Sequence, residues 1–303
     1  KEYETVENDP TNTRIYTLKN GLKVYLSVNE EAPRVQTSIA VRAGSKNDPS
    51  TATGLAHYLE HMLFKGTDVY GTLDFTKEGP LLDEIDSLYE VYRGTTDDDA
   101  RTALYAVIDS VSQLASTFAI ANEYDKMVSE MGAKGTNAYT SQEETVYIND
   151  IPTNQLEKWL TLEAERFRNP VLRLFHTELE AVYEEKNRGL DNDGREVYEK
   201  LFAEAFPNHN YGRQTTIGTI EHLKNPSLVK IRNYYNTYYV PNNMCFIMVG
   251  DFNADEVIAK IDKSFSYMQP KHVASYKFSP EKEIISPIES TIYGPDAEYL
   301  TMA

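Results

Sequence analysis

Residues 57–66 read HYLEHMLFKG, and this stretch decides how the rest of the chain is interpreted. His57 and His61 stand four positions apart, so on a helix both imidazoles project from one face, one turn from each other. Glu60 lies beside them, close enough to reach a water on a shared metal ion but off the coordination axis. Zinc accepts imidazole nitrogens, and a neighbouring carboxylate can act as general base for a metal-bound water. The stretch therefore predicts a hydrolytic zinc site on a helix.

The residues around this motif favour a helix that buries one side. Apolar residues recur at the spacing of one helical face before Gly66 ends the segment. These residues are Leu55, Leu59, Met62 and Leu63. The order His-x-x-Glu-His is the inverse of the His-Glu-x-x-His motif of many zinc proteases. The alternative is a surface helix that carries two histidines and a glutamate by chance, which is a rare coincidence in a chain with six histidines.

A catalytic zinc site needs a third protein ligand, and the acidic segment that begins at His176 offers two rows of candidates. Glu178 and Glu185 are seven positions apart, so they stack on one face of a helix, two turns from each other. Glu180 and Glu184 form the neighbouring row, which is typical of a solvated charged face. The spacing alone does not decide between the two rows.

Periodicity along the rest of the chain predicts a mixed fold. Alternating apolar residues around the turn Lys19-Asn20-Gly21 predict a β-hairpin over residues 14–27. Further strands are predicted at residues 35–42, 137–140, 145–149 and 243–251. Helices are predicted at residues 80–92, 97–131, 155–168, 176–206 with a break near Asp193-Gly194, 227–239 and 254–266. Because strands and helices do not alternate strictly, we expect an α+β fold, a largely antiparallel mixed sheet with helices packed on one face.

The composition excludes several classes of protein. Of 303 residues, 41% are hydrophobic and 25% are charged, as in folded domains rather than disordered or repetitive chains. A net charge of -17 repels phosphate backbones and argues against nucleic acid as a partner. No apolar run approaches the roughly 18 residues of a membrane helix, so no membrane span is expected in this segment. The single cysteine, Cys245, lies in an apolar stretch and is expected to be a buried thiol.

Several segments, in the right order, resemble one family of enzymes. Residues 57–66 resemble the zinc-site helix of the pitrilysin and insulysin family of metallopeptidases, which includes the mitochondrial processing peptidase. Residues 135–141, GTNAYTS, resemble the family's substrate-binding edge strand, and residues 178–185 resemble its second zinc helix. Residues 210–218, 238–244 and 249–251 resemble later signatures of the family. The likeness covers about residues 13–267 and implies the N-terminal catalytic part of a longer, bacterial-type member.

The resemblance implies a role for each residue of the site. His57, His61 and Glu185 become the ligands of one Zn²⁺ per chain, and Glu60 becomes the general base. Glu178 becomes a carboxylate that orients a histidine or the ligand geometry from behind, as metal sites commonly require.

Asn137 and Ala138 are the expected substrate contacts. In the family the corresponding strand holds the substrate, and an exposed strand edge can pair with the backbone of an extended peptide. Such pairing tolerates many peptide sequences. The alternative is an ordinary internal strand with no role in binding.

The implied function is a zinc endopeptidase that cuts peptides or unfolded segments. The resemblance implies a chamber closed by a C-terminal homologous half or partner subunit, so the isolated chain is expected to be inactive or weakly active. The competing interpretation is a non-catalytic structural or partner-binding subunit of the same fold. A chain without an intrachain disulfide leaves the compartment open, with the bacterial periplasm or cell envelope favoured over the cytoplasm.

The chain departs from the family in the distance between His61 and Glu185. Compared with the family, roughly fifty additional residues lie there, and they fall between residues 70 and 131. Their helical pattern predicts an inserted helical hairpin, because an unstructured loop of that length is uncommon in a compact domain. We therefore expect a catalytic domain over residues 1–268, with an insertion at about 70–131. Residues 269–303 are expected to be a linker and the truncated start of a second domain, with a strand near 290–293.

Overall fold

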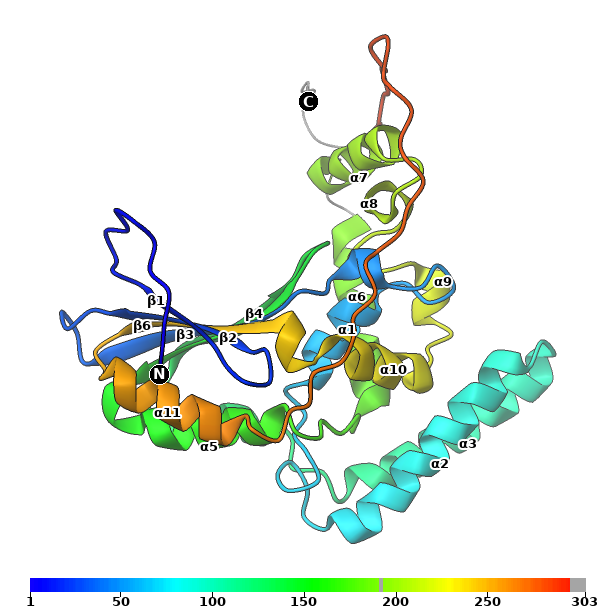
Figure 1. The fold of residues 1–303 in the computed structure, drawn as a ribbon. Helices are drawn as coiled ribbons and strands as arrows, with labels where there is room; N and C mark the ends of the chain where they lie inside the picture. Colours follow the sequence, from blue (N-terminus) through cyan, green and yellow to red (C-terminus); the bar gives the residue numbers. More distant parts are fainter. Residues whose placement is uncertain (191–192, 295–303) are drawn as a thin grey trace.

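A six-stranded mixed sheet forms the centre of the protein in the computed structural model, which describes residues 1–190 and 193–294 (Figure 1). The strands, in spatial order, are β1 (Arg14–Thr17), β2 (Lys23–Val28), β6 (Met244–Gly250), β3 (Arg34–Val41), β5 (Thr145–Pro152) and β4 (Lys134–Thr140). All neighbours are antiparallel except β2 and β6, which run parallel. The hairpin predicted around Asn20-Gly21 is confirmed as β1 and β2, and Gly21 supplies the left-handed backbone of its turn with a φ of 86°.

Helices cover one face of this sheet, as predicted. The helices α5 (Leu156–Arg166) and α11 (Ala254–Ser264) lie side by side along it (Figure 1). Trp159 of α5 and Phe265 at the end of α11 pack edge-on against Phe246 of β6, with ring centroids 6.5 and 4.6 Å apart. The alternate residues of β6, Ile247 and Val249, keep 39% and 40% of their surface exposed. Buried and partly exposed side chains therefore alternate along β6, and the buried ones lie on the face that the helices cover.

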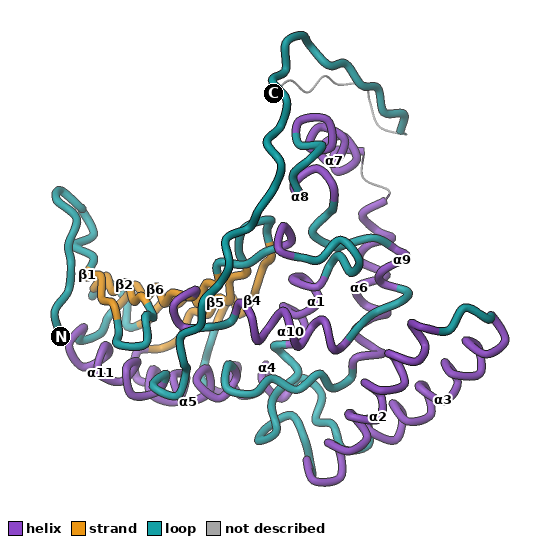
Figure 2. The backbone as a smooth tube through the Cα atoms, turned by 45° about the vertical axis from the view of Figure 1, so that its right-hand side comes forward, coloured by secondary structure: helices purple, strands orange, loops and turns teal. Residues whose placement is uncertain are grey.

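A second group of helices lies beyond the β4 edge of the sheet (Figure 2). The helix α1 (Leu55–Met62) packs against β4, against α6 (Phe175–Leu190) and against α10 (Leu228–Tyr238). Its apolar face is buried as the sequence predicted: Leu55, Leu59, Met62 and Leu63 are all nearly inaccessible. The short helices α8 (Asn210–Arg213) and α9 (Ile220–Leu223) and the longer α7 (Asp193–Ala205) complete this part. The structure describes α6 up to Leu190 and α7 from Asp193 onward; residues 191–192, next to the predicted break near Asp193-Gly194, lie outside the described residues.

A helical hairpin extends away from the sheet, and its first helix packs against α10 of the second group of helices (Figures 1 and 2). It consists of α2 (Phe75–Gly94) and α3 (Asp98–Ser116) and is followed by α4 (Glu123–Glu130). The prediction of one helix over residues 97–131 is therefore wrong. Between α3 and α4, Phe118 and Ile120 bond through their backbones to Leu73 and Gly71, at 2.7 and 2.9 Å, which removes them from any helix.

A buried ion pair ties the hairpin to the body. The Arg173 guanidinium donates to both carboxylate oxygens of Glu78, at 2.9 and 3.0 Å, and both side chains are 1% exposed. Arg173 also donates to the backbone carbonyl oxygens of Lys65 and Thr67, each at 2.7 Å. The Arg173 guanidinium thus links the loop after α1 to the first turn of α2.

We expect Glu78→Ala to lower the free energy of unfolding by about 3–5 kcal/mol, because it leaves the Arg173 charge buried without its partner. Urea unfolding measures this loss. The matched control is Glu84→Ala, since Glu84 is exposed on the same helix and should change stability by less than about 0.5 kcal/mol. Equal losses in the two variants would contradict the role of the pair.

Residues 269–294 run over the surface without helix or strand. The strand predicted near 290–293 is therefore wrong, because none of the described residues offers it a neighbouring strand. Instead, Tyr276 and Phe278 pack against His209, with ring centroids 4.8 and 4.5 Å away. The hydroxyl oxygen of Tyr276 accepts a hydrogen bond from the backbone of Asn210 at 3.1 Å. Side chains rather than sheet pairing fix this segment, and residues 295–303 lie outside the described residues.

Candidate metal centre

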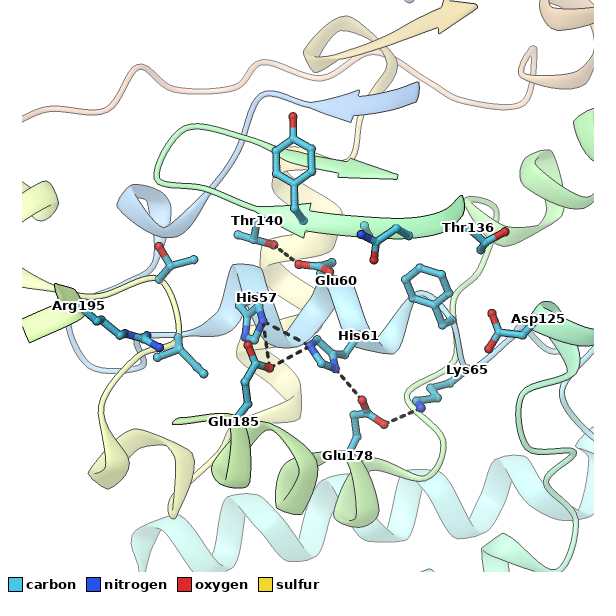
Figure 3. A pocket seen from close by; sticks show the side chains of 16 residues that line it. His57, Glu60, His61, Lys65, Asp125, Thr136, Thr140, Glu178, Glu185 and Arg195 are labelled. Atoms are coloured by element: carbon cyan, nitrogen blue, oxygen red, sulfur yellow. Dashed lines mark hydrogen bonds and ion pairs between the residues drawn. The ribbon is translucent and has the colours of Figure 1, made fainter. Parts of the chain in front are cut away.

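The helices α1 and α6 bring three donor atoms to one point (Figure 3). His57 Nε2 and His61 Nε2 are 3.3 Å apart on α1. Glu185 Oε2, on α6, lies 3.6 Å from the first nitrogen and 3.7 Å from the second. The two helices are adjacent because the apolar side of α1 packs in the core beside α6.

These distances suit a zinc ion. Tetrahedral zinc with ligand bonds of 2.0–2.2 Å places its ligand atoms about 3.3–3.6 Å apart, close to the three separations seen here. Two imidazole nitrogens and one carboxylate oxygen are also a donor set that catalytic zinc sites use, with the fourth position left for water. The group His57, His61 and Glu185 could therefore hold a metal ion.

The structure separates the two acidic rows of α6 that spacing alone left open. Both Glu184 and Glu185 are exposed, but Glu185 points its carboxylate at the two histidines and lines the cleft beside them, whereas Glu184 is not among the residues that line it. Glu180 lies on another side of the helix, where its carboxylate is 3.8 Å from His176 Nε2. Only the row of Glu178 and Glu185 turns toward α1.

Glu178 supports the site from behind His61. His61 Nδ1 donates to Glu178 Oε1 at 2.7 Å, and Lys65 Nζ donates to the other carboxylate oxygen at 2.5 Å. Burial acts to lower the pKa of His61, but the bond to Glu178 and the nearby carboxylates raise it overall. Burial likewise opposes ionisation of Glu178, yet His61 and Lys65 hold its pKa below the usual range. The bond leaves His61 Nε2 as the lone-pair nitrogen and increases its basicity.

His57 has the lower pKa of the two histidines. Burial, the neighbouring His61 and the charge of Arg195 lower the pKa of His57 to about 4. A neutral imidazole can offer a nitrogen lone pair to a metal near neutral pH. Its other nitrogen, Nδ1, is buried without a hydrogen-bond partner among the described residues.

Glu60 lies on the β4 side of the two histidines (Figure 3). Thr140, at the end of β4, donates its hydroxyl to Glu60 Oε2 at 2.6 Å, and Glu60 is only 7% exposed. Burial raises the pKa of Glu60 more than this hydrogen bond and His61 lower it. A carboxylate with a raised pKa is a stronger base than a solvated one, which suits proton transfer.

The donor group opens into a cleft of about 620 Å³ whose wall includes β4. Asn137 and Ala138, the predicted substrate contacts, both line this cleft. β4 is the edge strand of the described sheet and pairs only with β5, so the alternative of an internal strand is wrong. The outer edge of β4 is therefore available to another extended chain.

Several residues of the cleft received no role from the sequence, among them Lys65, Thr140 and Arg195. Lys65 stands four residues after His61, so helical spacing could have suggested its contact with Glu178. Thr140 reaches Glu60 across 80 positions, and Arg195 comes from α7. No sequence pattern links these two to the motif, because only the folded chain brings them there.

Comparison with protein families identifies the chain. A model of the family described as Insulinase (Peptidase family M16) matches residues 23–79 and 113–219, more than half of the chain. This chain belongs to the insulinase family. The gap in the match, residues 80–112, falls within the α2–α3 hairpin. A second model of the insulinase family, the Peptidase M16 inactive domain, matches residues 227–300.

Individual members of the insulinase family resemble the chain over most of its length. Mouse insulin-degrading enzyme is 26% identical over 91% of the chain, and the zinc protease PqqE of Helicobacter pylori is 26% identical over 89%. The beta subunit of a probable mitochondrial-processing peptidase from Arabidopsis thaliana is 23% identical over 84%. The aligned part covers 23%, 49% and 39% of these relatives, respectively, so the chain spans less than half of each.

Solved structures of proteases share the fold. A protease from Helicobacter pylori aligns with a TM-score of 0.66 and 25% identity, covering 87% of this chain and 52% of that one. The first half of the periplasmic protease PqqL from Escherichia coli aligns with a TM-score of 0.66 and 21% identity, covering 92% and 51%. Across residues 1–190 and 193–294, no helix combines the length and apolar character needed to cross a membrane.

Proposed function

We propose that this chain is the zinc-binding catalytic part of an endopeptidase that hydrolyses peptides or unfolded segments. The observation that carries the proposal is the convergence of His57 Nε2, His61 Nε2 and Glu185 Oε2 beside the buried carboxylate of Glu60. Membership of a peptidase family supports it, as does the presence of zinc proteases among the relatives.

Each residue of the site has one task in this proposal. His57, His61 and Glu185 hold one zinc ion. When bound, the ion would polarise the scissile carbonyl and lower the pKa of a water molecule bound to it. Glu60 accepts the proton of that water and passes it to the departing amine. Thr140 keeps the Glu60 carboxylate turned toward the cleft through its hydrogen bond. Glu178 fixes the orientation of the His61 ring.

The edge strand β4 binds the substrate. An extended peptide that pairs with β4 would place its backbone along the cleft, with Asn137 and Ala138 as contacts close to Glu60. Backbone pairing accepts many sequences, so the enzyme is expected to cut a broad set of peptides. A segment whose backbone is already hydrogen-bonded inside a folded protein could not pair with this edge.

The whole enzyme is larger than this chain in the proposal. The matched part covers 52% of the Helicobacter pylori protease structure and 26% of the whole PqqL structure, which supports a C-terminal homologous half or partner subunit that closes the cleft. Residues 1–268 would form the catalytic domain, and residues 269–303 would connect it to a second domain. A periplasmic location is favoured, since PqqL is a periplasmic protease of similar fold.

The test of the metal assignment is a pair of neighbouring substitutions on α6. Glu185→Ala removes one of three ligands and should lose most of the bound zinc, because a two-histidine site binds far more weakly. Glu184→Ala changes the adjacent, exposed glutamate and should retain about one zinc per chain. Metal analysis after dialysis measures both. Zinc loss in Glu184→Ala but not in Glu185→Ala would overturn the assignment, and a wild-type chain without zinc would favour a non-catalytic subunit.

A further inference from the structure

The cleft carries opposite charges at its two ends. Arg195 lies at one end, beside His57, and Asp125 lies at the other, beyond Lys65 (Figure 3). β4 passes between them, with Thr140 toward the Arg195 end and Thr136 toward the Asp125 end. A peptide laid along β4 would therefore meet a cation on one side of the donor group and a carboxylate on the other.

Glu199 and Gly189 are among the neighbours of Arg195 at its end of the cleft. Its Nε donates to Glu199 Oε1 at 3.0 Å, one turn further along α7, and about a third of its side chain is exposed. Its Nη1 lies against Gly189 of α6, so close that a Cβ there would come within 2.3 Å. Gly189 follows the metal-facing Glu185 by one helical turn. Because Gly189 has no side chain, it leaves room for the Arg195 guanidinium to extend to the cleft.

Arg195 and Lys65 both line the cleft, but their charged groups have different surroundings. Lys65 is bound to Glu178 at 2.5 Å, and both side chains are largely buried, so its charge serves the support of His61. Arg195 stands beyond the donor group, where a substrate side chain would lie.

We propose that Arg195 selects substrates with an aspartate or glutamate side chain at the position that lies next to His57. The inference rests on the proposed function and specifies the class of peptide for the same site. A guanidinium recognises carboxylate through charge and paired N–H donors. Asp125 repels the same side chain at the other end, so the preference should appear on one side of the cleaved bond only.

The test compares peptides of one sequence in which Glu, Gln or Lys stands in turn at three positions on either side of the cleaved bond. The protein is the zinc-loaded chain completed by its C-terminal half. The wild type should favour Glu over Lys at one of these positions by about tenfold in kcat/KM. Arg195→Gln should remove most of this preference, and Arg195→Glu should reverse it. Arg188→Gln, an exposed arginine of α6 outside the cleft wall, should keep the wild-type ratio.

A second variant tests the position of the charge rather than its presence. Gly189→Ala should reduce the Glu-over-Lys ratio, because the new methyl group displaces the tip of Arg195, while bound zinc stays at the wild-type level. Loss of zinc in this variant would mean that α6 itself had moved. Persistence of the Glu preference in both Arg195→Glu and Gly189→Ala would overturn the inference.

Failure of the proposed function is distinguishable from failure of this inference. Cleavage of the Gln peptide by the wild type tests the peptidase activity alone. If no peptide is cut, fluorescence anisotropy with the same labelled peptides still tests the inference, since Glu peptides should bind about tenfold more tightly than Lys peptides. Equal binding of the two by the wild type would then refute the role of Arg195 independently of catalysis.

Discussion

Glu60→Gln is expected to reduce peptide cleavage by about 10³-fold or more while one zinc per chain remains bound. The substitution keeps the size of the side chain and its acceptor for the Thr140 hydroxyl, but the amide cannot take a proton from water. The three donor atoms of His57, His61 and Glu185 are untouched. Steady-state cleavage of a fluorescent peptide, together with metal analysis of the same sample, measures both properties.

The matched control for this result is Glu184→Gln, which makes the same chemical change at an exposed glutamate of α6. It should cleave at the wild-type rate. Zinc loss in Glu60→Gln would show that Glu60 is a ligand rather than a base. Full activity in Glu60→Gln would show that another group accepts the proton.

The second large effect concerns the completeness of the enzyme. The chain alone should bind zinc yet cleave peptides several orders of magnitude more slowly than the same chain completed by its C-terminal half. The described residues line the cleft from α1, α4, α6, α7, β4 and residues 216–217. They provide nothing that holds the far side of a peptide or excludes water, and such positioning effects commonly contribute about 10²-fold or more each.

Mixing the chain with its separately produced C-terminal half measures this effect, with a quenched fluorescent peptide as substrate and a chelator as the control for zinc dependence. Both samples should contain equal zinc. Equal chelator-sensitive turnover by the chain alone would contradict the two-part mechanism and leave the zinc assignment standing.

The sequence could predict whatever depends on short-range periodicity. The spacing of His57, Glu60 and His61 predicts a helix with all three on the cleft side, and α1 has this arrangement. The hairpin turn at Asn20-Gly21 and the single-face cover of the sheet follow from local pattern in the same way. The edge position of β4 could also be expected, although there the resemblance to a family supplied the argument.

Contacts between distant segments could not be predicted. Thr140 meets Glu60 only because β4 ends above α1, and Arg195 reaches the cleft only because α7 folds back past Gly189. The predicted helix over residues 97–131 failed for a related reason. Helical periodicity persists there, but Phe118 and Ile120 find backbone partners near Gly71, and this tertiary pairing outweighs local propensity.

The place of β6 in the sheet has a consequence for how the protein is made. β6 lies between β2 and β3, although it follows β3 by about two hundred residues. A ribosome adding about 5–20 residues per second needs roughly 10–40 s to deliver it after β3 has emerged. Throughout that interval β2 and β3 each present an unpaired strand edge, the feature that invites nascent chains to associate. The yield of this protein in a cell thus depends on what protects those two edges until the last strand arrives.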